Sequence, residues 1–275
     1  MQKKQYILLL ITLCIVAGIY FFGKTTHQNK ATATNTTIAS TTTFDAYEEE
    51  VLQQLNSTNK DSLMLWKTAL NNANSTKDKA QLLQKISFFW QQQQNVGLEA
   101  YYFQQYTDVL KDTSLLKENA SLWIFALKNN KDSIISNNIS TFANQSLEKV
   151  LEKNPDDVDA KIMQAEYFVL QGENPMQGIG ILKSIIDKDP HNEKALMALG
   201  RFSLQSGQFD KARERFKQVL EHNNQNTEAL YFLAITEAEA GNKETAINLF
   251  ELCKQLVQNE DFSKEIDAII ENLKR

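Results

Sequence analysis

A 34-residue period in the second half of the chain is the feature that most restricts its fold. The segments ALMALGRFSLQSGQFDKARERFKQVL and ALYFLAITEAEAGNKETAINLFELCK align at this offset. The residues that repeat are small, glycine or aromatic: Gly200 with Ala234, Gly207 with Gly241, Ala212 with Ala246, and Phe216 with Phe250. A small side chain lets two helices approach closely, glycine closes a turn at positive φ, and an aromatic ring fills the space between units. The spacing therefore predicts stacked helix-turn-helix units.

An earlier unit fits the same pattern with one extra residue. Counting forward from Pro155 places Ala165 at the small position of the first helix and Gly172 at the elbow. Counting back from Pro190 places Gly178 at the small crossing position, and the two counts differ by one residue inside ENPM. A phosphate-binding loop follows a β-strand, whereas the stretch before these glycines, AKIMQAEYFVLQ, is predicted to be helical. We therefore interpret QGENPMQGIG as the elbow of a helical hairpin.

This arrangement resembles the tetratricopeptide repeat family. Three units cover residues 158–260, and a half-unit, ANQSLEKVLEKNP, precedes them. The chain departs from the family pattern because no tryptophan occupies the first aromatic position, and Asn224 stands where Pro155 and Pro190 end the earlier units. The resemblance implies an all-α fold, an α-solenoid of tetratricopeptide-like helical hairpins. In such a solenoid the first helix of each hairpin lines a concave groove that holds extended or helical peptide segments.

Carrying the family's concave positions over to this sequence yields ten candidate groove residues. They are Ile162, Glu166, Val169, Lys194, Met197, Arg201, Leu204, Tyr231, Ile235 and Glu239. The set is mostly apolar, so we expect a hydrophobic or amphipathic partner segment with an acid facing Arg201. If these side chains point into the groove, substituting Arg201→Glu together with Met197→Glu abolishes partner capture and leaves melting unchanged.

Residues 44–140 show helical periodicity without the 34-residue match. The stretch KAQLLQKISFFWQQQQ, for example, places Leu83, Ile86 and Trp90 on one stripe. We expect degenerate helical hairpins here, joined by a long connection, NKDSIISNNIS, to the repeats of residues 141–260. Residues 261–275 carry their isoleucines and leucine on one stripe, which predicts a C-terminal capping helix.

The stretch YILLLITLCIVAGIYFF, residues 6–22, is uncharged and long enough to cross a bilayer as a helix. We expect a retained transmembrane signal anchor after a short cytoplasmic N-terminus of residues 1–5. Cleavage near residues 31–33, lipidation at Cys14 and burial as a core helix are the alternatives. Residues 23–43 are rich in threonine and predict a disordered tether. The lysines before the span slightly favour a cytoplasmic N-terminus, which puts the repeats in the periplasm and the anchor in a bacterial inner membrane.

No chemical motif accompanies the repeats. The chain has 29 basic and 34 acidic residues, an acidic balance that makes it a poor binder of nucleic acid. His27 falls in the tether, His191 and His222 fall in predicted loops, and Cys253 falls at a core position. No nucleophile lies near a base and no ligands have metal-binding spacing, so we expect no catalytic residue, metal, cofactor or small-molecule substrate.

Three functional hypotheses follow. In the leading one the chain is a membrane-tethered interaction scaffold, similar in layout to bacterial envelope proteins of the resembled family. It binds another envelope protein, assists its assembly or folding, and touches the lipid bilayer through residues 6–22. In the second, the scaffold faces the cytoplasm and recruits soluble partners. In the third, the chain is an enzyme with a site near Trp90 and Trp123, a hypothesis that a packed helix interface at those residues would count against.

Overall fold

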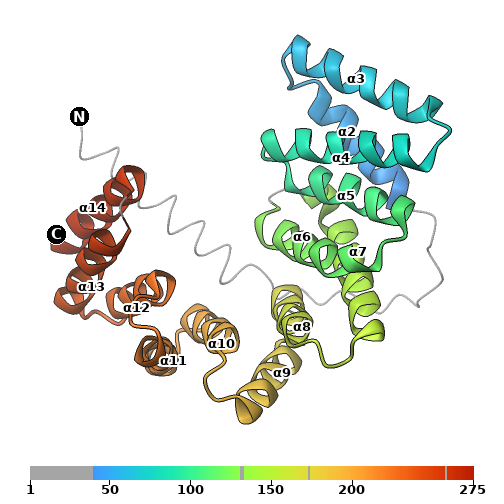
Figure 1. The fold of residues 1–275 in the computed structure, drawn as a ribbon. Helices are drawn as coiled ribbons and strands as arrows, with labels where there is room; N and C mark the ends of the chain where they lie inside the picture. The colour runs from blue at the N-terminus through green and yellow to red at the C-terminus, as the bar shows by residue number, and fades with distance from the viewer. Residues whose placement is uncertain (1–39, 131–132, 173, 258) are drawn as a thin grey trace, which may run out of the picture. The chain divides into compact units, whose positions relative to one another are not determined.

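The computed structural model describes residues 40–275 apart from 131–132, 173 and 258, and every element in this part of the chain is a helix (Figure 1). Residues 40–275 form one compact unit, which is described below. Its helices are α2 (Ser40–Leu52), α3 (Ser57–Asn72), α4 (Thr76–Gln92), α5 (Val96–Leu110), the 3-10 turn η1 (Thr113–Leu115), α6 (Leu116–Asn129), α7 (Ser133–Lys153), α8 (Val158–Gln171), α9 (Pro175–Lys188), α10 (Glu193–Gln205), α11 (Phe209–His222), α12 (Thr227–Glu239), α13 (Lys243–Leu256) and α14 (Glu260–Lys274). The expectation of an all-α fold is confirmed for this unit.

The helices pair in chain order into hairpins that stack on one another. The pairs are α4–α5, α6–α7, α8–α9, α10–α11 and α12–α13, and α14 packs on α13. The second helix of each hairpin also contacts the first helix of the next, while α6 contacts α8, α8 contacts α10 and α10 contacts α12. Consecutive hairpins of the unit follow a curve, with these first helices on its inner side (Figure 1).

Aspartate and asparagine side chains cap the first helix of each hairpin in the repeat region. Asp157, Asn192 and Asn226 each accept a hydrogen bond from the backbone N–H three residues later, at 2.9, 3.1 and 2.9 Å. The alanine that donates this bond is fully buried in every case. An N-cap of this kind is worth about 1 kcal/mol. These three caps follow the repeat period, and they are a sequence signal for the helix starts that the alignment of small residues did not use.

Glycine closes each elbow of the repeat region as the spacing predicts. Gly172, Gly207 and Gly241 have φ angles of 71°, 71° and 84°. This left-handed conformation is readily adopted by glycine because it has no Cβ. Between the first two of these elbows, Pro175 occupies the first turn of α9, where its missing N–H leaves no hydrogen bond unmade.

The small residues lie where helices cross, which supports the interpretation of the 34-residue period. A Cβ atom added to Gly178 on α9 would lie 2.4 Å from the backbone oxygen of Ala165 on α8. A Cβ atom on Gly200 would lie 2.5 Å from the ring of Phe216. The repeated alanines are fully buried between neighbouring helices: Ala212, Ala234 and Ala246. Backbone contact at these points brings the two helices of a hairpin together.

Helices α2 and α3 of the N-terminal half lie outside these hairpins, and α3 packs on α4. Helix α2 packs against α5 and α7, the second helices of two hairpins. Its Phe44 stacks on Tyr101 with ring centroids 4.7 Å apart, and meets Trp123 and Phe142 at 5.9 Å each. Trp90 and Trp123 are both fully buried in this core. The packed helix interface counts against the hypothesis of an enzyme site at these two tryptophans.

A buried carboxylate ties α2 to three further helices. Glu48 accepts hydrogen bonds from Trp90 Nε1 at 3.2 Å and from the hydroxyl of Tyr102 at 2.9 Å, and it pairs with Lys67 Nζ. Burial, followed by the nearby charge of Glu48, raises the pKa of Tyr102. A carboxylate with this many donors satisfies the polar groups that the aromatic core encloses.

Two sequence-based boundaries differ in the structure. The expected long connection NKDSIISNNIS is wrong, because α7 is one helix from Ser133 to Lys153 and pairs with α6. Its core-facing stripe, spaced four residues apart, is buried along the whole helix: Ile135, Ile139, Ala143 and Leu147. Packing of that stripe overrides the low helix propensity of the asparagines and serines between them. The other difference is that α2 begins at Ser40, so the last four residues of the expected tether, 23–43, are helical.

The remaining N-terminal predictions, for residues 1–5, 6–22 and 23–39, lie outside the described residues. Among the helices of residues 40–275 that the structure describes, none combines the length and the hydropathy needed to cross a membrane. At the other end of the chain, α14 covers the segment expected to form a cap. Its Ile266 and Ile270 are buried in the cluster around Phe250.

Candidate functional site: a groove along four helices

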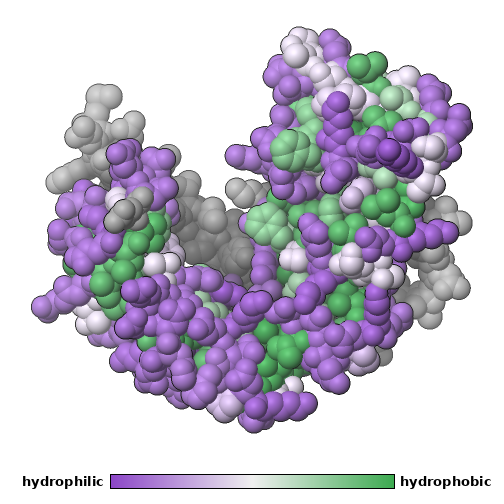
Figure 2. Space-filling model, viewed as in Figure 1, coloured by the Kyte–Doolittle hydropathy of each residue, from purple (hydrophilic) through white to green (hydrophobic). Residues whose placement is uncertain are grey.

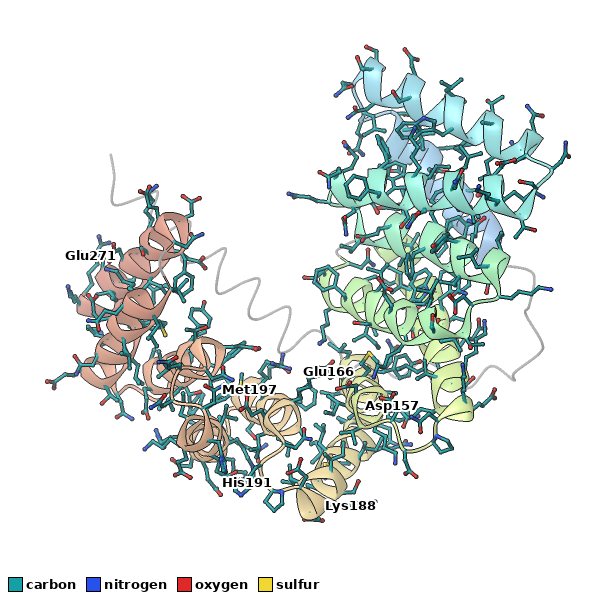
Figure 3. All side chains as sticks on the ribbon, viewed as in Figure 1. Asp157, Glu166, Lys188, His191, Met197 and Glu271 are labelled. Carbon is teal, nitrogen blue, oxygen red and sulfur yellow. The ribbon has the colours of Figure 1, made fainter. Side chains whose placement is uncertain are left out.

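The first helices of four consecutive hairpins line one groove. Residues of α6, α8, α10 and α12, together with Ser114 of η1, enclose a hollow of about 940 Å³. Glu166 on α8 and Met197 on α10 lie on the inner side of the curve, whereas Lys188 and His191 lie on its outer side (Figure 3). Hydrophilic side chains cover most of the visible surface over α10 to α12 (Figure 2). The groove lies on the side of the solenoid where the first helices meet.

The structure brings five of the ten predicted residues together in this groove. They are Ile162, Glu166, Lys194, Met197 and Arg201. The other five lie elsewhere. Three pack in hydrophobic clusters between helices: Leu204, Tyr231 and Ile235. Val169 packs against α9 beside Gly178, and Glu239 lies at the elbow loops near Gly207. Each of these five is near the C-terminal end of its helix or on α12, and none of them lines the hollow.

Sequence reasoning missed the contribution of α6. Its Lys117, Glu118, Ser121 and Lys128 line the groove, although α6 lies before the recognisable repeats. The three- and four-residue spacing of the first three puts them on one helical face. That spacing is visible in the sequence. Because α6 does not match the 34-residue period, however, nothing in the sequence showed that this face of α6 continues the groove.

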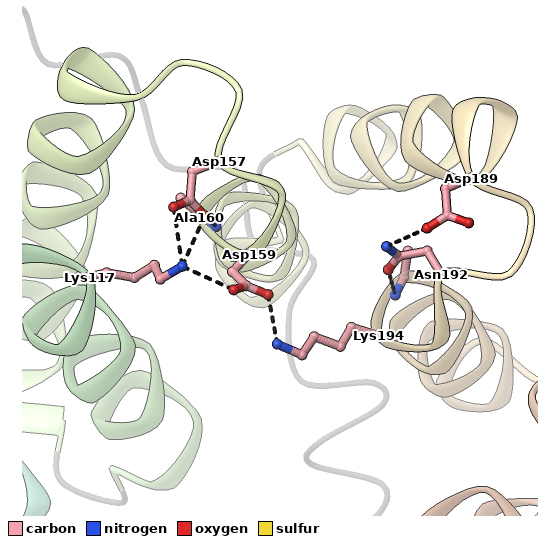
Figure 4. Close-up of polar contacts among 8 residues, drawn as sticks. Lys117, Asp157, Asp159, Ala160, Asp189, Asn192 and Lys194 are labelled. Atoms are coloured by element: carbon pink, nitrogen blue, oxygen red, sulfur yellow. Dashed lines mark hydrogen bonds and ion pairs between the residues drawn. The ribbon is translucent and has the colours of Figure 1, made fainter. Parts of the chain in front are cut away.

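A first chain of ion pairs joins α6, α8 and α10 (Figure 4). Lys117 Nζ lies 3.0 Å from Asp159 Oδ2 and 3.2 Å from Asp157 Oδ2. Lys194 Nζ lies 2.7 Å from the other oxygen of Asp159. Asp157 is also the N-cap of α8, since it accepts the backbone N–H of Ala160. Asp159 is thereby shared between lysines of the preceding and following hairpins.

A second chain of ion pairs runs parallel to the first and reaches α12. Lys128 Nζ lies 2.8 Å from Glu166 Oε2, and Arg201 Nη2 lies 3.1 Å from Glu166 Oε1. Arg201 Nη1 continues to Glu228 at 2.8 Å. The guanidinium also lies 5.8 Å from the ring centre of Phe232. The Glu166 side chain is only 8% exposed, so this carboxylate is part of the groove floor.

In these two chains of ion pairs the charge therefore alternates from helix to helix, basic on α6 and α10 and acidic on α8 and α12. Asp159 and Glu166 are seven residues apart on α8, as Lys194 and Arg201 are on α10. Seven residues make about two helical turns, so each pair lies on one face. The two acids precede the two bases by 35 residues, close to one repeat. Neighbouring repeats thus supply opposite charges at equivalent positions, and the groove neutralises much of its own charge.

This pairing changes two expectations. The groove is more polar than the ten predicted residues suggested, and Arg201, bonded to two carboxylates, offers no unpaired guanidinium to an acid of a partner. Met197 is 5% exposed and packs with Phe216. Met197→Glu would therefore bury a carboxylate in an apolar cluster. The double substitution with Arg201→Glu is now expected to lower the melting temperature, where the sequence predicted no change.

Protonation of Asp159 should remove the stabilisation that the first chain of ion pairs contributes. Hydrogen bonds from Lys194, and then from Lys117, hold the pKa of Asp159 below its ordinary value, which is about 3.9 in an unfolded chain. A carboxyl whose pKa is lowered by folding stabilises the protein above the unfolded pKa, and this is lost as pH falls through the folded pKa.

The test compares the protein with Asp159→Asn by urea denaturation across pH. We expect their difference in free energy of unfolding to be constant between about pH 7 and about pH 5 and to disappear below the folded pKa. A difference that persists unchanged in strong acid would contradict the assignment of Asp159 to the ion pairs.

The described residues offer little to chemistry other than binding. Within residues 40–275 as described, no group of three or more His, Cys, Asp or Glu side chains could hold a metal ion. His191 and His222 are exposed and in contact on the outer side of the curve. Cys253 is fully buried, and burial raises the pKa of its thiol to about 11. A thiol held so far from ionisation at neutral pH is a core residue and not a nucleophile.

Comparison with known proteins agrees with this geometry. Residues 170–216 and 203–261 match the family model described as tetratricopeptide repeat. No curated protein matches the sequence. The crystal structure of TTC0263, a thermophilic TPR protein of Thermus thermophilus, is similar over 69% of this chain and 97% of that one, with 15% identity and a TM-score of 0.52. Identity this low establishes the fold alone.

Two further structures align less closely. PilW, a type IV pilus biogenesis factor, has 16% identity and a TM-score of 0.44 over 73% of this chain and 94% of its own. YrrB, a TPR protein with an unusual peptide-binding site, has 14% identity and a TM-score of 0.42 over 74% of this chain and 97% of its own. At these TM-scores neither likeness bears on function. The repeat period, the hairpin stacking and the family match agree that residues 170–261 form tetratricopeptide repeats.

Proposed function

We propose that this chain is a membrane-tethered scaffold whose groove holds an amphipathic segment of another cell-envelope protein. As a tetratricopeptide repeat protein it is a scaffold for protein–protein interactions, since stacked repeats bind through an extended concave surface. The observation that carries the proposal is the groove itself. Four helices from successive hairpins contribute to one hollow of about 940 Å³, large enough for several side chains of a bound segment.

The lining of the groove favours an amphipathic segment. Ile162 lies between Asp159 and Glu166 on α8, and Met197 lies between Lys194 and Arg201 on α10, so a narrow apolar strip separates the two chains of ion pairs. A helix or strand with one apolar stripe can cover this strip while its polar flanks meet the charges. A wholly apolar segment would desolvate the ion pairs without replacing their contacts with water.

Residues 6–22 support the tether. An uncharged stretch of that length fits a bilayer, and the lysines around it slightly favour an N-terminus in the cytoplasm. To test the topology, a reporter that is active only in the periplasm and one that is active only in the cytoplasm are each fused after Arg275. We expect activity from the periplasmic reporter alone. Activity from the cytoplasmic reporter alone would replace this proposal with the cytoplasm-facing scaffold.

Site-specific cross-linking in intact cells tests the groove. A photo-reactive amino acid replaces Ser121, an exposed residue of the groove, in one variant and Ser184, an exposed residue of α9 that does not line it, in the other. We expect a discrete protein adduct from position 121 and none from position 184, because α9 lies on the opposite side of its hairpin. Mass spectrometry of the adduct identifies the partner. Equal adducts from both positions, or none from position 121, would count against the groove.

A further inference from the structure

A second hollow continues the groove beyond α6 toward the N-terminal end of the described unit. It has a volume of about 470 Å³ and is lined by residues of α4, α5 and α6. Glu118 and Ser121 border both hollows, so the two form one continuous surface. Apolar side chains reach the visible surface over α4 to α6 (Figure 2). None of the ten residues predicted from the family pattern lies in this second hollow.

The apolar part of this hollow is the phenylalanine pocket, defined by Phe88, Phe103, Leu122 and Phe125. Phe88 is 59% exposed and Phe125 is 50% exposed. The aromatic residues of the neighbouring core, by contrast, are fully or nearly fully buried. Two half-exposed phenylalanines that border one concavity make a contiguous apolar patch, and such patches mark sites of interaction. Burial of these rings by a partner side chain gives the kind of anchored contact that dominates binding energy.

The charges around the phenylalanine pocket are all negative. Its lining contains Glu99 and Glu118 and no lysine, arginine or histidine. Glu99 is buried, its carboxylate accepts one hydrogen bond from Gln91 Nε2 at 2.9 Å, and burial raises its pKa. Glu118 is exposed and takes part in none of the ion pairs found among the described residues. A cation placed between these carboxylates would be attracted by both.

The adjoining groove offers no similar attraction to an acidic segment. Its four basic residues, Lys117, Lys128, Lys194 and Arg201, are each paired with a carboxylate of a neighbouring helix. Together the two hollows are lined by six acidic residues and these four bases. An acidic partner would have to displace existing ion pairs, whereas a basic one meets Glu118, which is exposed, and Glu99, and neither of these takes part in those ion pairs. Charge complementarity therefore favours a partner segment with a positive charge.

We propose that the phenylalanine pocket receives a bulky apolar side chain of a basic amphipathic partner segment, with a lysine or arginine one turn away held by Glu99 and Glu118. This inference rests on the proposed function, because it assumes that the groove is the binding surface, and it names the class of segment that binds there. The apolar side chain covers Phe88 and Phe125, and the cation lies at the border between the two hollows.

The test uses the full chain in lipid nanodiscs and three synthetic helical peptides labelled with a fluorophore. The first peptide has a leucine stripe flanked by lysines, the second has the same stripe flanked by glutamates, and the third keeps the lysines with alanines in place of leucines. Fluorescence anisotropy gives the three dissociation constants. We expect the leucine–lysine peptide to bind at least about tenfold more tightly than either of the others, because each lacks one of the two contacts.

Four variants assign the binding to this pocket. Glu118→Lys should reverse the preference between the lysine and glutamate peptides, and Glu118→Gln should reduce it. Phe125→Ser should raise the dissociation constant of the leucine–lysine peptide at least about tenfold. The matched control is Leu65→Ser on α3, which removes a side chain that is 68% exposed and outside the groove. It should change no dissociation constant.

Other outcomes overturn the inference. If Phe125→Ser leaves the dissociation constant of the leucine–lysine peptide unchanged, the peptide is held only by attraction to an acidic surface. A dimer of the chain in sedimentation that Phe125→Ser dissociates makes a second copy the occupant. If the pocket variants leave peptide affinity unchanged while cross-linking from position 121 still captures a partner, the pocket assignment fails and the groove function stands. If position 121 captures nothing, the proposed function itself fails.

Discussion

Replacing Trp123 by alanine should lower the free energy of unfolding by about 3–5 kcal/mol, the usual range for a fully buried large aromatic side chain. The ring is fully buried and stacks on Phe142 with centroids 4.9 Å apart. Phe44 meets its edge, and its Nε1 donates to Gln104 at 3.3 Å. Alanine would leave a cavity among α2, α6 and α7, and Gln104 Oε1 would keep only its hydrogen bond from Ser146.

Urea denaturation followed by circular dichroism measures this loss. The matched control is Phe125→Ala, two residues along the same helix, where the ring is 50% exposed. We expect that substitution to change stability by less than about 1 kcal/mol, since partly exposed side chains lose little burial. Hydrogen exchange of Trp123→Ala should also show faster exchange in α2, because Phe44 of that helix depends on this ring. A loss below about 1 kcal/mol for Trp123→Ala would contradict the packing described for the N-terminal half.

Gly178→Ala should destabilise the protein by about 1–3 kcal/mol even though alanine is the better helix former. A Cβ atom there would lie 2.4 Å from the backbone oxygen of Ala165 and 3.0 Å from Val169. Backbone cannot move aside as a side-chain tip can, so α8 and α9 would have to separate. Because α8 carries Asp159 and Glu166, the same displacement would disturb both chains of ion pairs in the groove.

Gly180→Ala is the matched control, because its expected effect on stability is opposite to that of Gly178→Ala. Gly180 lies in the same helix, and a Cβ atom there would have no neighbour within 4 Å. Its substitution should stabilise the protein by up to about 1 kcal/mol through helix propensity alone. Thermal and urea denaturation of the two variants should therefore move in opposite directions. Stabilisation by Gly178→Ala would show that the two helices do not touch at this glycine.

The repeat region illustrates how much local sequence can predict. The positions of Gly207, Gly241, Ala212 and Ala246 were interpreted as elbows and crossings from spacing alone, and the structure places them there. An elbow needs a residue that adopts positive φ, and a helix crossing needs a side chain without bulk. The type of residue at each position therefore predicts the local geometry.

The helix α7 shows where local sequence was insufficient. Its asparagines and serines favour a loop, and only the burial of Ile135 and Ile139 against other helices makes the segment helical. The groove shows the same limit. Val169 and Leu204 were assigned to the concave face by analogy between units, but Val169 lies beside Gly178 and Leu204 packs against a hydrophobic cluster. Such packing contacts depend on neighbours that are distant in sequence.

By itself the sequence determined the class of fold, the repeat length and the elbows, because each of these depends on residue types at short spacing, and the family resemblance implied that the first helices line the groove. Tertiary structure alone decided which charges are already paired. Glu166 joins Lys128 to Arg201 across 38 and 35 residues, and such a triad exists only when three helices are side by side. The same stacking left Phe88 and Phe125 exposed around one hollow while Trp90 and Trp123, equally apolar, became core. Burial is a property of the assembled helices, which no single helix encodes.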